Sequence, residues 1–426
     1  GPLVLLFLTF RPRHSLPTIM PTNAFALQKQ PSVPEGFQLS GIHCGIKSNP
    51  EKEDLTIILS DRAATACGVY TENLVRAAPV TLDQARTPNR DTRAVVINSG
   101  NANACTGERG LNDAKQMCQL LAESCGLAAE QVLVLSTGII GVFLPMEVIG
   151  RGIAEAAGQL KSDEQALLAA ARGMMTTDTV PKLASCRVPT GSSRDITITG
   201  LAKGAAMIGP RMATMLGIVM TDAAIAPDVA QSLLASVVAE TFNCIHVDGH
   251  MSTNDSVLLL ANGAANREVS GGEMLTAFRD GVCAVCAELA RSIPADGEGA
   301  THLITIAVRG CRDEQAARSI ARTIADSPLV KTAIAGADPN WGRIISAAGY
   351  AGVPFDAHQM ELKLNGYLLF SASCPVAFPV DEVSQSIRDN RDVSIELTFG
   401  EGSAETQFWT TDLTEEYVRL NADYHT

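Results

Sequence analysis

The stretch Lys203–Leu216 reads KGAAMIGPRMATML and leads into the apolar residues GIVM. Within it, Thr214 follows the small residue Ala213 and stands at the start of a predicted β-strand. A threonine in this setting is suited to self-cleavage: its hydroxyl attacks the preceding carbonyl, an N-to-O acyl shift follows, and water releases a new amino terminus. The freed α-amine, with a pKa of about 8, then accepts the hydroxyl proton. A buried threonine that opens a core strand has the same pattern, so these residues alone leave both interpretations open.

Apolar β-branched runs and amphipathic runs alternate on both sides of this stretch. The predicted strands are 55–59, 94–98, 132–135, 195–199, 217–220, 257–261, 303–308 and 393–399. The predicted helices are 113–125, stopped by Gly126, 146–160, with Pro145 in its first turn, 229–241, 273–292 and 314–326. This order predicts an α/β fold, an α+β layered sandwich. With 426 residues, the chain forms either two domains or one large layered domain.

The composition excludes several classes of protein. Hydrophobic residues make up 46% of the chain and charged residues 19%, as in a packed globular protein rather than a disordered one. A formal net charge of −13, without a stripe of Lys and Arg, argues against nucleic-acid binding. No segment has the length and apolarity of a membrane span, so no membrane partner is expected.

The cysteines and the N-terminal residues bear on the compartment. The 11 cysteines are an odd number in mostly apolar settings, which indicates free thiols in a reducing compartment and predicts a cytoplasmic protein. Cys283 and Cys286 form a C-x-x-C inside a predicted helix without a second pair, so no metal site is expected. Residues 1–19 are interpreted as a non-native or disordered extension, with Met20 as a plausible start.

Other segments carry groups that acyl transfer needs. Thr137 and Gly138 follow the apolar run VLVL, where a threonine hydroxyl and a glycine N–H could form an oxyanion hole. Glu298, between two glycines, suits a substrate ammonium, and Lys203 suits a substrate carboxylate. A plain β-turn and solvated surface charges are the simpler interpretations of the same residues.

Seven segments together resemble the ornithine acetyltransferase family, the glutamate N-acetyltransferases of the cyclic arginine pathway. In chain order they are NSGNANACTG (98–107), STGIIG (136–141) with LP after it, MTTDT (175–179), KGAAMIGPRMATML (203–216), DGEGAT (296–301), GADPNWGR (336–343) and YVRLNADYHT (417–426). The resemblance runs from about residue 41 to residue 426. No single segment is decisive, but seven segments in register are specific.

The resemblance implies a self-cleaved N-terminal-nucleophile enzyme. Cleavage between Ala213 and Thr214 would give an α chain, residues 20–213, and a β chain, residues 214–426, which assemble as an α2β2 heterotetramer. Thr214 would take the acetyl group from N2-acetyl-L-ornithine, release ornithine and pass the acetyl group to L-glutamate in a ping-pong reaction. The resemblance implies no cofactor and no metal. It leaves open acetyl-CoA as a co-substrate in an additional amino-acid N-acetyltransferase activity.

The resemblance also assigns roles to single residues. Thr137 and Gly138 match the oxyanion hole, and the substrate-binding positions match Thr176, Lys203, Thr214, Glu298, Asn421 and Thr426. Lys203 suits the α-carboxylate that both substrates share, and Glu298 suits the side-chain ammonium of ornithine. Glutamate carries a carboxylate in place of that ammonium, so the same pocket must accept two opposite charges.

The sequence departs from the family pattern at a few positions. Ala206 stands where glycine is common, Arg211 where Asn or Ser is frequent, His250 where an acid is usual, and His425 where Arg is common. None of these departures removes a proposed catalytic group. The alternative function is an N-terminal-threonine amidohydrolase or aminopeptidase of related fold, in which water rather than glutamate takes the acyl group.

Overall fold

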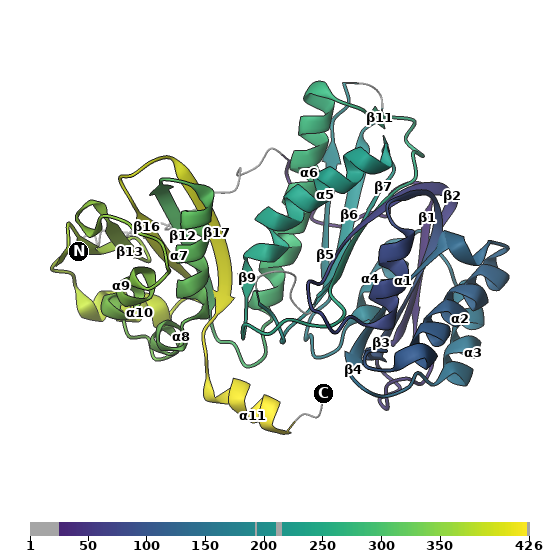
Figure 1. Cartoon of the computed structure of the whole chain (residues 1–426), viewed down its shortest axis with the longest axis horizontal. Helices are drawn as coiled ribbons and strands as arrows, with labels where there is room; N and C mark the ends of the chain where they lie inside the picture. Colours follow the sequence, from purple (N-terminus) through teal and green to yellow (C-terminus); the bar gives the residue numbers. More distant parts are fainter. Residues whose placement is uncertain (1–24, 192–193, 210–214, 424–426) are drawn as a thin grey trace, which may run out of the picture.

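The computed structural model describes residues 25–191, 194–209 and 215–423 of the chain, and Figure 1 shows two groups of strands and helices beside each other. The larger group contains a sheet with the spatial order β4-β3-β2-β10-β7-β6-β5, and β1 pairs with β2. Its strands are β1 (Phe37–Ile42), β2 (Leu55–Tyr70), β3 (Asn89–Asn101), β4 (Val132–Ile139), β5 (Lys182–Val188), β6 (Ile196–Lys203), β7 (Leu216–Thr221) and β10 (Ser256–Ala261).

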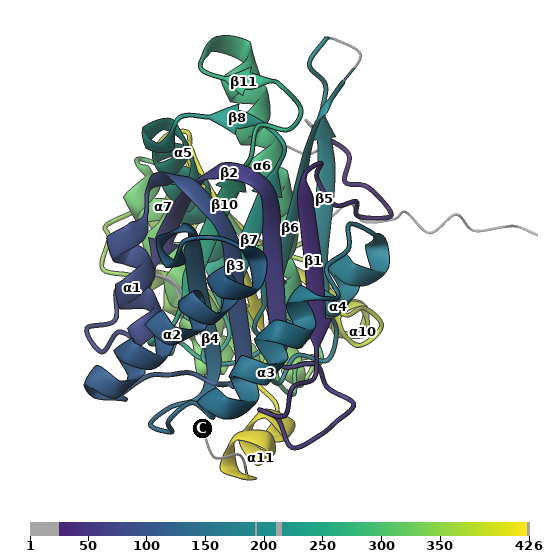
Figure 2. The same cartoon turned by 90° about the vertical axis from the view of Figure 1, so that its right-hand side faces the viewer.

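The long strand β2 folds this sheet into two layers. Its pairing with β3 shifts register between Leu59 and Ala64, and its last residues pair with β10 instead. Figure 2 shows β2 bending over below β8 and β11. As a result, Ile58 and Ile97 from one layer share a buried cluster with Ile218 from the other. An apolar core therefore lies between the two layers.

Helices cover the outer faces of the two layers. Helices α2 (Gly107–Cys125) and α3 (Met146–Ala157) pack on β2, β3 and β4 through residues such as Val96. Helices α5 (Pro227–Glu240) and α6 (Gly272–Ala295) pack on β5, β6, β7 and β10 through residues such as Val219. Neighbouring residues of a strand point to opposite faces, so each strand serves both the inner core and one helix layer. The predicted layered sandwich is confirmed.

The second group is built on a sheet with the order β15-β14-β13-β16-β12-β17-β9. Its strands are β9 (Ile245–His246), β12 (Leu303–Cys311), β13 (Glu361–Leu364), β14 (Tyr367–Ser371), β15 (Cys374–Pro375), β16 (Asp392–Thr398) and β17 (Ala404–Thr411). Its helices are α7 (Glu314–Asp326), α8 (Pro328–Ala335), α9 (Trp341–Gly349) and α10 (Val380–Arg388). Leu303 and Trp409 join the cluster around α6, so the second sheet packs against the sandwich through that helix.

The remaining elements complete the sandwich. Helices α1 (Ala78–Arg86) and α4 (Glu164–Met174) belong to it, as does the two-stranded pair of β8 (Ala224–Ile225) and β11 (Glu268–Val269). Helix α11 (Glu415–Asp423) follows the second sheet and lies at the lower end of the sandwich in Figure 2.

Strand pairing shows what the predicted cleavage would divide. The strands on its two sides, β6 and β7, are antiparallel neighbours, and Lys203 pairs with Leu216. The predicted bond, Ala213–Thr214, lies outside the described residues. Because β6 precedes it and β7 follows it, the predicted α and β chains would both contribute strands to one sheet.

Most predicted elements lie within observed ones. Helix 314–326 is confirmed with its bounds, and Gly126 ends α2 in a left-handed conformation with φ of 67°. The helix predicted over 146–160 ends earlier, at Ala157, because Gly158 follows it. The strand predicted over 55–59 continues to Tyr70 through the charged pair Asp61–Arg62, which interrupts its apolar pattern. Several further elements, such as β5, α4 and α11, are not among those predicted.

Candidate active site

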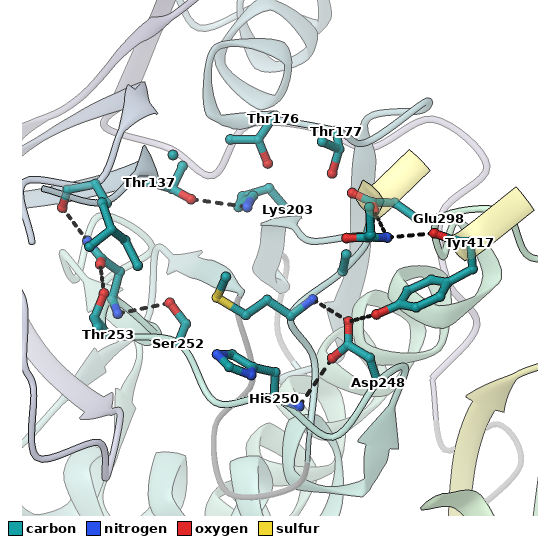
Figure 3. Close-up of a pocket in the computed structure, with 18 residues that line it drawn as sticks. Thr137, Thr176, Thr177, Lys203, Asp248, His250, Ser252, Thr253, Glu298 and Tyr417 are labelled. Carbon is teal, nitrogen blue, oxygen red and sulfur yellow. Dashed lines mark hydrogen bonds between the residues drawn. The ribbon is translucent and has the colours of Figure 1, made fainter. Parts of the chain in front are cut away.

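A cavity of about 330 Å³ lies at the end of the sandwich where β4 and β6 end and where β7 and β10 begin. Six residues predicted from the sequence line it, namely Thr137, Gly138, Thr176, Lys203, Glu298 and Asn421. Figure 3 shows several of these side chains around the cavity. The predicted residues Ala213, Thr214 and Thr426 lie outside the described residues. The structure therefore brings together residues that are far apart in the sequence.

We define the inner wall of the cavity as Thr137, Gly138, Lys203 and Asn254. Gly138 has a φ of +136°, and a Cβ added there would lie 2.3 Å from the carbonyl carbon of Gly100 on β3. Only glycine fits this position, because the φ is unfavourable for other residues and the neighbouring backbone is too close. The end of β4 thus has a fixed course at the cavity.

Lys203 connects β6 to the end of β4. Its Nζ donates a hydrogen bond to Thr137 Oγ1 over 3.1 Å. Because that hydroxyl accepts from the ammonium, its own proton is free to be donated into the cavity. Burial lowers the pKa of the Lys203 ammonium, and the nearby Asp178 carboxylate opposes this shift.

Asp178 holds the threonine segment of the cavity in place. Its carboxylate accepts hydrogen bonds from Lys182 Nζ at 2.7 Å, from Gly204 N at 2.7 Å and from Thr176 N at 3.1 Å. Burial would raise the pKa of this carboxyl, but Lys182 and Lys203 outweigh it and bring the pKa to about 2. Asp178 is therefore an ionised group inside the protein.

Lys182 extends this network to the opposite loop. Its buried Nζ also donates to Asp296 Oδ2 over 2.6 Å, and Asp296 accepts from the backbone N of Thr179 at 3.0 Å. The network Asp178–Lys182–Asp296 links the segment that carries Thr176 to the loop that carries Glu298. A buried cation between two carboxylates needs all three partners, because an unpaired buried charge is costly.

Two further aspartate side chains bind the chain on either side of residues 210–214. Asp248 accepts hydrogen bonds from Met207 N and Ile208 N, each at 2.8 Å. Asp255 accepts one from Met215 N at 3.1 Å. Asp255 is fully buried, which raises the pKa of its carboxyl well above its usual range. Its second oxygen has no hydrogen-bond partner among the residues that the structure describes.

Asn254 ties the two layers of the sandwich together at the cavity. Its Nδ2 donates to Ala102 O at 2.6 Å and to Ser136 O at 2.8 Å. Both acceptors lie beside the ends of β3 and β4, whereas Asn254 lies two residues before β10. The inner wall is thus fixed by hydrogen bonds between strand ends.

We define the outer wall of the cavity as His250, Glu298, Tyr417 and Asn421. Glu298 donates its backbone N–H to Ala205 O at 2.9 Å, and its Oε2 accepts from Asn421 Nδ2 at 3.0 Å. Tyr417 OH donates to Asp248 Oδ2 at 3.1 Å, and burial together with Asp248 raises the pKa of that phenol. Helix α11 therefore completes the outer wall (Figure 3).

The sequence prediction omitted several residues that form this site. Asp178, Lys182, Asp248, Asn254 and Asp255 were not singled out, although Asp178 lies inside the segment MTTDT. Their signal in the sequence is weak, because each acts through partners in other segments. The available signal is the presence of lysine and aspartate at positions that the apolar neighbouring residues predict to be buried.

The described part of the chain has neither a metal cluster nor a membrane-spanning helix. No cluster of His, Cys, Asp or Glu in residues 25–191, 194–209 and 215–423 has the arrangement of a metal site. Within those ranges no helix has the length and apolarity to cross a membrane. Cys283 and Cys286 are free, buried thiols on α6, and burial raises the pKa of Cys283 to about 11.

Comparison with known proteins relates this cavity to one family. Residues 38–426 match the model of the ArgJ family. The chain is 44% identical over 397 residues to the arginine biosynthesis bifunctional protein ArgJ of Rhodopirellula baltica, covering 92% of this chain and 96% of that protein. It is 44% identical over 398 residues to the protein of the same name from Symbiobacterium thermophilum, covering 93% and 98%.

Solved structures of similar sequence cover about half of this chain. The arginine biosynthesis bifunctional protein from Bacillus halodurans is 38% identical, with a TM-score of 0.48, over 49% of this chain and 98% of that chain. Ornithine acetyltransferase from Mycobacterium tuberculosis, crystallised with ornithine, is 34% identical, with a TM-score of 0.41, over 44% and 98%.

Proposed function

The chain belongs to the ArgJ family, and from this premise we propose that it transfers acetyl groups in arginine biosynthesis. It is a glutamate N-acetyltransferase that moves acetyl from N2-acetyl-L-ornithine to L-glutamate. The observation that carries the proposal is the single cavity in which Thr137, Gly138, Lys203 and Glu298 meet beside the start of β7. The alternative, an amidohydrolase or aminopeptidase, is not favoured, because the curated relatives are named for arginine biosynthesis.

Thr214 is the proposed nucleophile, formed by cleavage after Ala213. Its hydroxyl attacks the acetyl carbonyl of N-acetylornithine, and its α-amine accepts the hydroxyl proton. When the tetrahedral intermediate collapses, the C–N bond breaks, the proton passes to the departing ornithine amine, and an acetyl-threonine ester is left. The amine of glutamate then attacks this ester, and the same steps run in reverse to give N-acetylglutamate.

The proposed oxyanion hole consists of the Thr137 hydroxyl and the Gly138 N–H. Two observations support this assignment. Lys203 occupies the acceptor side of the Thr137 hydroxyl, so its proton can point to a developing negative charge. The course of the chain at Gly138 is also fixed before substrate binds, and a donor that needs no reorganisation stabilises a transition state best.

The substrate-binding assignments rest on charge and on the position of each side chain. Lys203, a buried cation, is the proposed partner of the α-carboxylate that both substrates share. Glu298 is the proposed partner of the ornithine ammonium. Thr176, Asn421 and Thr426 add hydrogen bonds in the proposal, and Thr176 and Asn421 line the cavity.

The proposal extends to assembly, location and a second donor. Both chains would remain in one fold, since β6 and β7 pair across the cleavage site, and two such units would form an α2β2 heterotetramer. The cysteines are free thiols, which supports a cytoplasmic location. Acetyl-CoA is the proposed second donor, with no resident cofactor, and N-acetylglutamate formed from acetyl-CoA and glutamate is the measurement that tests it.

Intact-mass analysis of the purified protein tests the central proposal. We expect two chains of similar mass in place of one of 44.9 kDa. After incubation with N-acetylornithine, the C-terminal chain should gain about 42 Da, one acetyl group in place of a hydrogen. Glutamate should then discharge the adduct to N-acetylglutamate. An uncut chain, or equal release of acetate with and without glutamate, would contradict the transferase proposal.

A further inference from the structure

The two substrates of the proposed reaction differ at one end. Both carry an α-amino group and an α-carboxylate, but the side chain of ornithine ends in an ammonium and that of glutamate in a carboxylate. Glu298 suits the first and repels the second, because like charges at close range disfavour each other. The cavity therefore needs a second group that attracts a carboxylate.

The lining of the cavity offers few such groups. Among the described residues that line it, Lys203 and His250 are the ones that can carry a positive charge. Lys203 lies on the inner wall and is bonded to Thr137, where it suits the α-carboxylate common to both substrates. His250 lies on the outer wall, and Figure 3 shows it on a different side of the cavity from Glu298.

The backbone of His250 is held by a hydrogen bond. Its N–H donates to Asp248 Oδ1 over 3.1 Å. The same carboxylate binds Met207, Ile208 and Tyr417. Asp248 is thus engaged in positioning this loop. The His250 side chain is exposed to the cavity, and in the described part of the chain its imidazole has no hydrogen bond or ion pair.

We propose that His250 forms the subsite for the side-chain carboxylate of the acceptor glutamate. This inference rests on the proposed function and assigns the two substrates to two sides of the outer wall. The ornithine side chain extends toward Glu298, and the glutamate side chain extends toward His250. The α-carboxylate and the reacting amine keep the same positions in both half-reactions.

The charge on an imidazole decides how strongly it attracts a carboxylate. An imidazolium attracts the carboxylate more strongly than a neutral imidazole does. The charged and titratable groups around His250 are Asp248, Glu298, Tyr417 and Lys203 in the cavity. His246 and Asp326 lie beside Gly249, and Lys331 donates to the carbonyl of Val247 in the same loop. His250→Gln keeps a polar side chain but cannot carry a positive charge, so it tests the contribution of that charge to the binding of glutamate.

The experiment uses full-length, processed enzyme that has been acetylated with N-acetylornithine and freed of excess donor. The acetyl-enzyme is mixed with glutamate or with glutamine, which has nearly the same shape but no side-chain charge. We expect His250→Gln to lower the preference for glutamate over glutamine about tenfold, the worth of a charged hydrogen bond. His250→Lys should restore much of the preference, because it restores the cation.

The controls separate this inference from the proposed function. His358→Gln changes an exposed histidine in the second group of strands and should leave the preference unchanged. Acetylation by N-acetylornithine is measured for each variant, because this separates an effect on the donor step from an effect on the acceptor step. Failure of acetylation in wild-type enzyme would contradict the proposed function. Normal acetylation with the same glutamate preference in His250→Gln and wild type would overturn the role of His250, as would a His250→Lys variant that does not regain it.

Discussion

The inner wall of the cavity is held by contacts between strand ends, whereas the outer wall is held by loops and by the C-terminal helix. On the inner wall, Gly138 lies against the backbone of β3, and Asn254 bonds to carbonyls of two other segments. On the outer wall, Glu298 and the exposed Asn421 hold each other by a single side-chain bond of 3.0 Å.

This difference matches what each wall does in the proposed reaction. The chemistry is the same in both half-reactions, so the groups that stabilise it gain from a fixed geometry. The side chains of the two substrates differ, so the groups that bind them gain from freedom to adjust. Substitutions in the inner wall should therefore affect both substrates strongly, and substitutions in the outer wall should affect one substrate modestly.

The largest effect is expected at the nucleophile that the inner wall serves. Thr214→Ala removes the hydroxyl for both cleavage and acetyl transfer, so we expect one uncut chain and a loss of activity of roughly 10,000-fold or more. A denaturing gel and the rate of N-acetylglutamate formation are the measurements. Thr214→Ser retains a hydroxyl and should still be cut; normal activity in Thr214→Ala would refute the nucleophile.

The second prediction concerns the network that fixes the segment of Thr176 to the loop of Glu298. Lys182→Met leaves Asp178 and Asp296 buried without their cation, so unfolding free energy should fall by about 3–5 kcal/mol. Denaturant unfolding measures this loss, and exposed Lys115→Met is the control, with an expected change within about 0.5 kcal/mol. Equal stability of Lys182→Met and wild type would mean that the network contributes nothing.

The same network sets a dependence on pH. The pKa of Asp178 is lowered to about 2 in the folded state, below its unfolded value of about 3.9. Its stabilising contribution is therefore complete above the unfolded pKa and is lost as pH falls through the folded pKa. Stability should decline below about pH 4 in wild type, and Asp178→Asn should show a shallower decline; the same acid curve for both would contradict this.

The third prediction tests the oxyanion hole. Thr137→Ala removes one proposed donor to the oxyanion, and loss of one such donor lowers kcat about 100- to 1,000-fold. Both half-reactions should slow, since both pass through the same kind of intermediate. Single-turnover rates of acetylation and discharge measure this effect. Thr137→Ser should recover most of the rate, and a slow discharge with a normal acetylation would argue against a shared oxyanion hole.

The fourth prediction addresses the outer wall. Glu298→Gln removes the negative charge while its amide oxygen still accepts from Asn421. Loss of a charged hydrogen bond, worth about 1.5–3 kcal/mol, should weaken binding of N-acetylornithine by roughly 10- to 100-fold. The discharge of acetyl-enzyme by glutamate should not slow, because glutamate has no ammonium there. An equal loss with both substrates would remove the distinction between the two walls.

The smallest effect is expected at the exposed end of the outer wall. Asn421→Ala frees Glu298 of its partner and should raise KM for N-acetylornithine by about threefold, a loss of roughly 0.5–1 kcal/mol. Steady-state kinetics measure this change, with exposed Asn390→Ala as the control. A loss of kcat as large as that of Thr137→Ala would show that the outer wall also takes part in the chemistry.

Much of the fold could be predicted from the sequence, because its signals are local. The apolar runs at 94–98, 132–135 and 257–261 lie inside β3, β4 and β10. These residues are buried on both faces of the sheet, and such burial leaves a continuous apolar run in the chain itself. The bend of β2 was not predicted. The bend lies near the charged residues Asp61 and Arg62. In a local pattern such charges indicate the end of a strand, but here the packing of the two layers keeps the strand continuous.

The candidate site could likewise be predicted only in part. By itself, the sequence determined which chemical groups are available, among them Thr137, Gly138, Lys203 and Glu298, because small residues beside reactive ones are visible in the order of the chain. Only the tertiary structure decided which groups hold each other. Lys182 meets Asp296 across 114 residues and Asn421 meets Glu298 across 123. A buried charge or an exposed amide gains its function from such partners, and no local pattern specifies a partner so far along the chain.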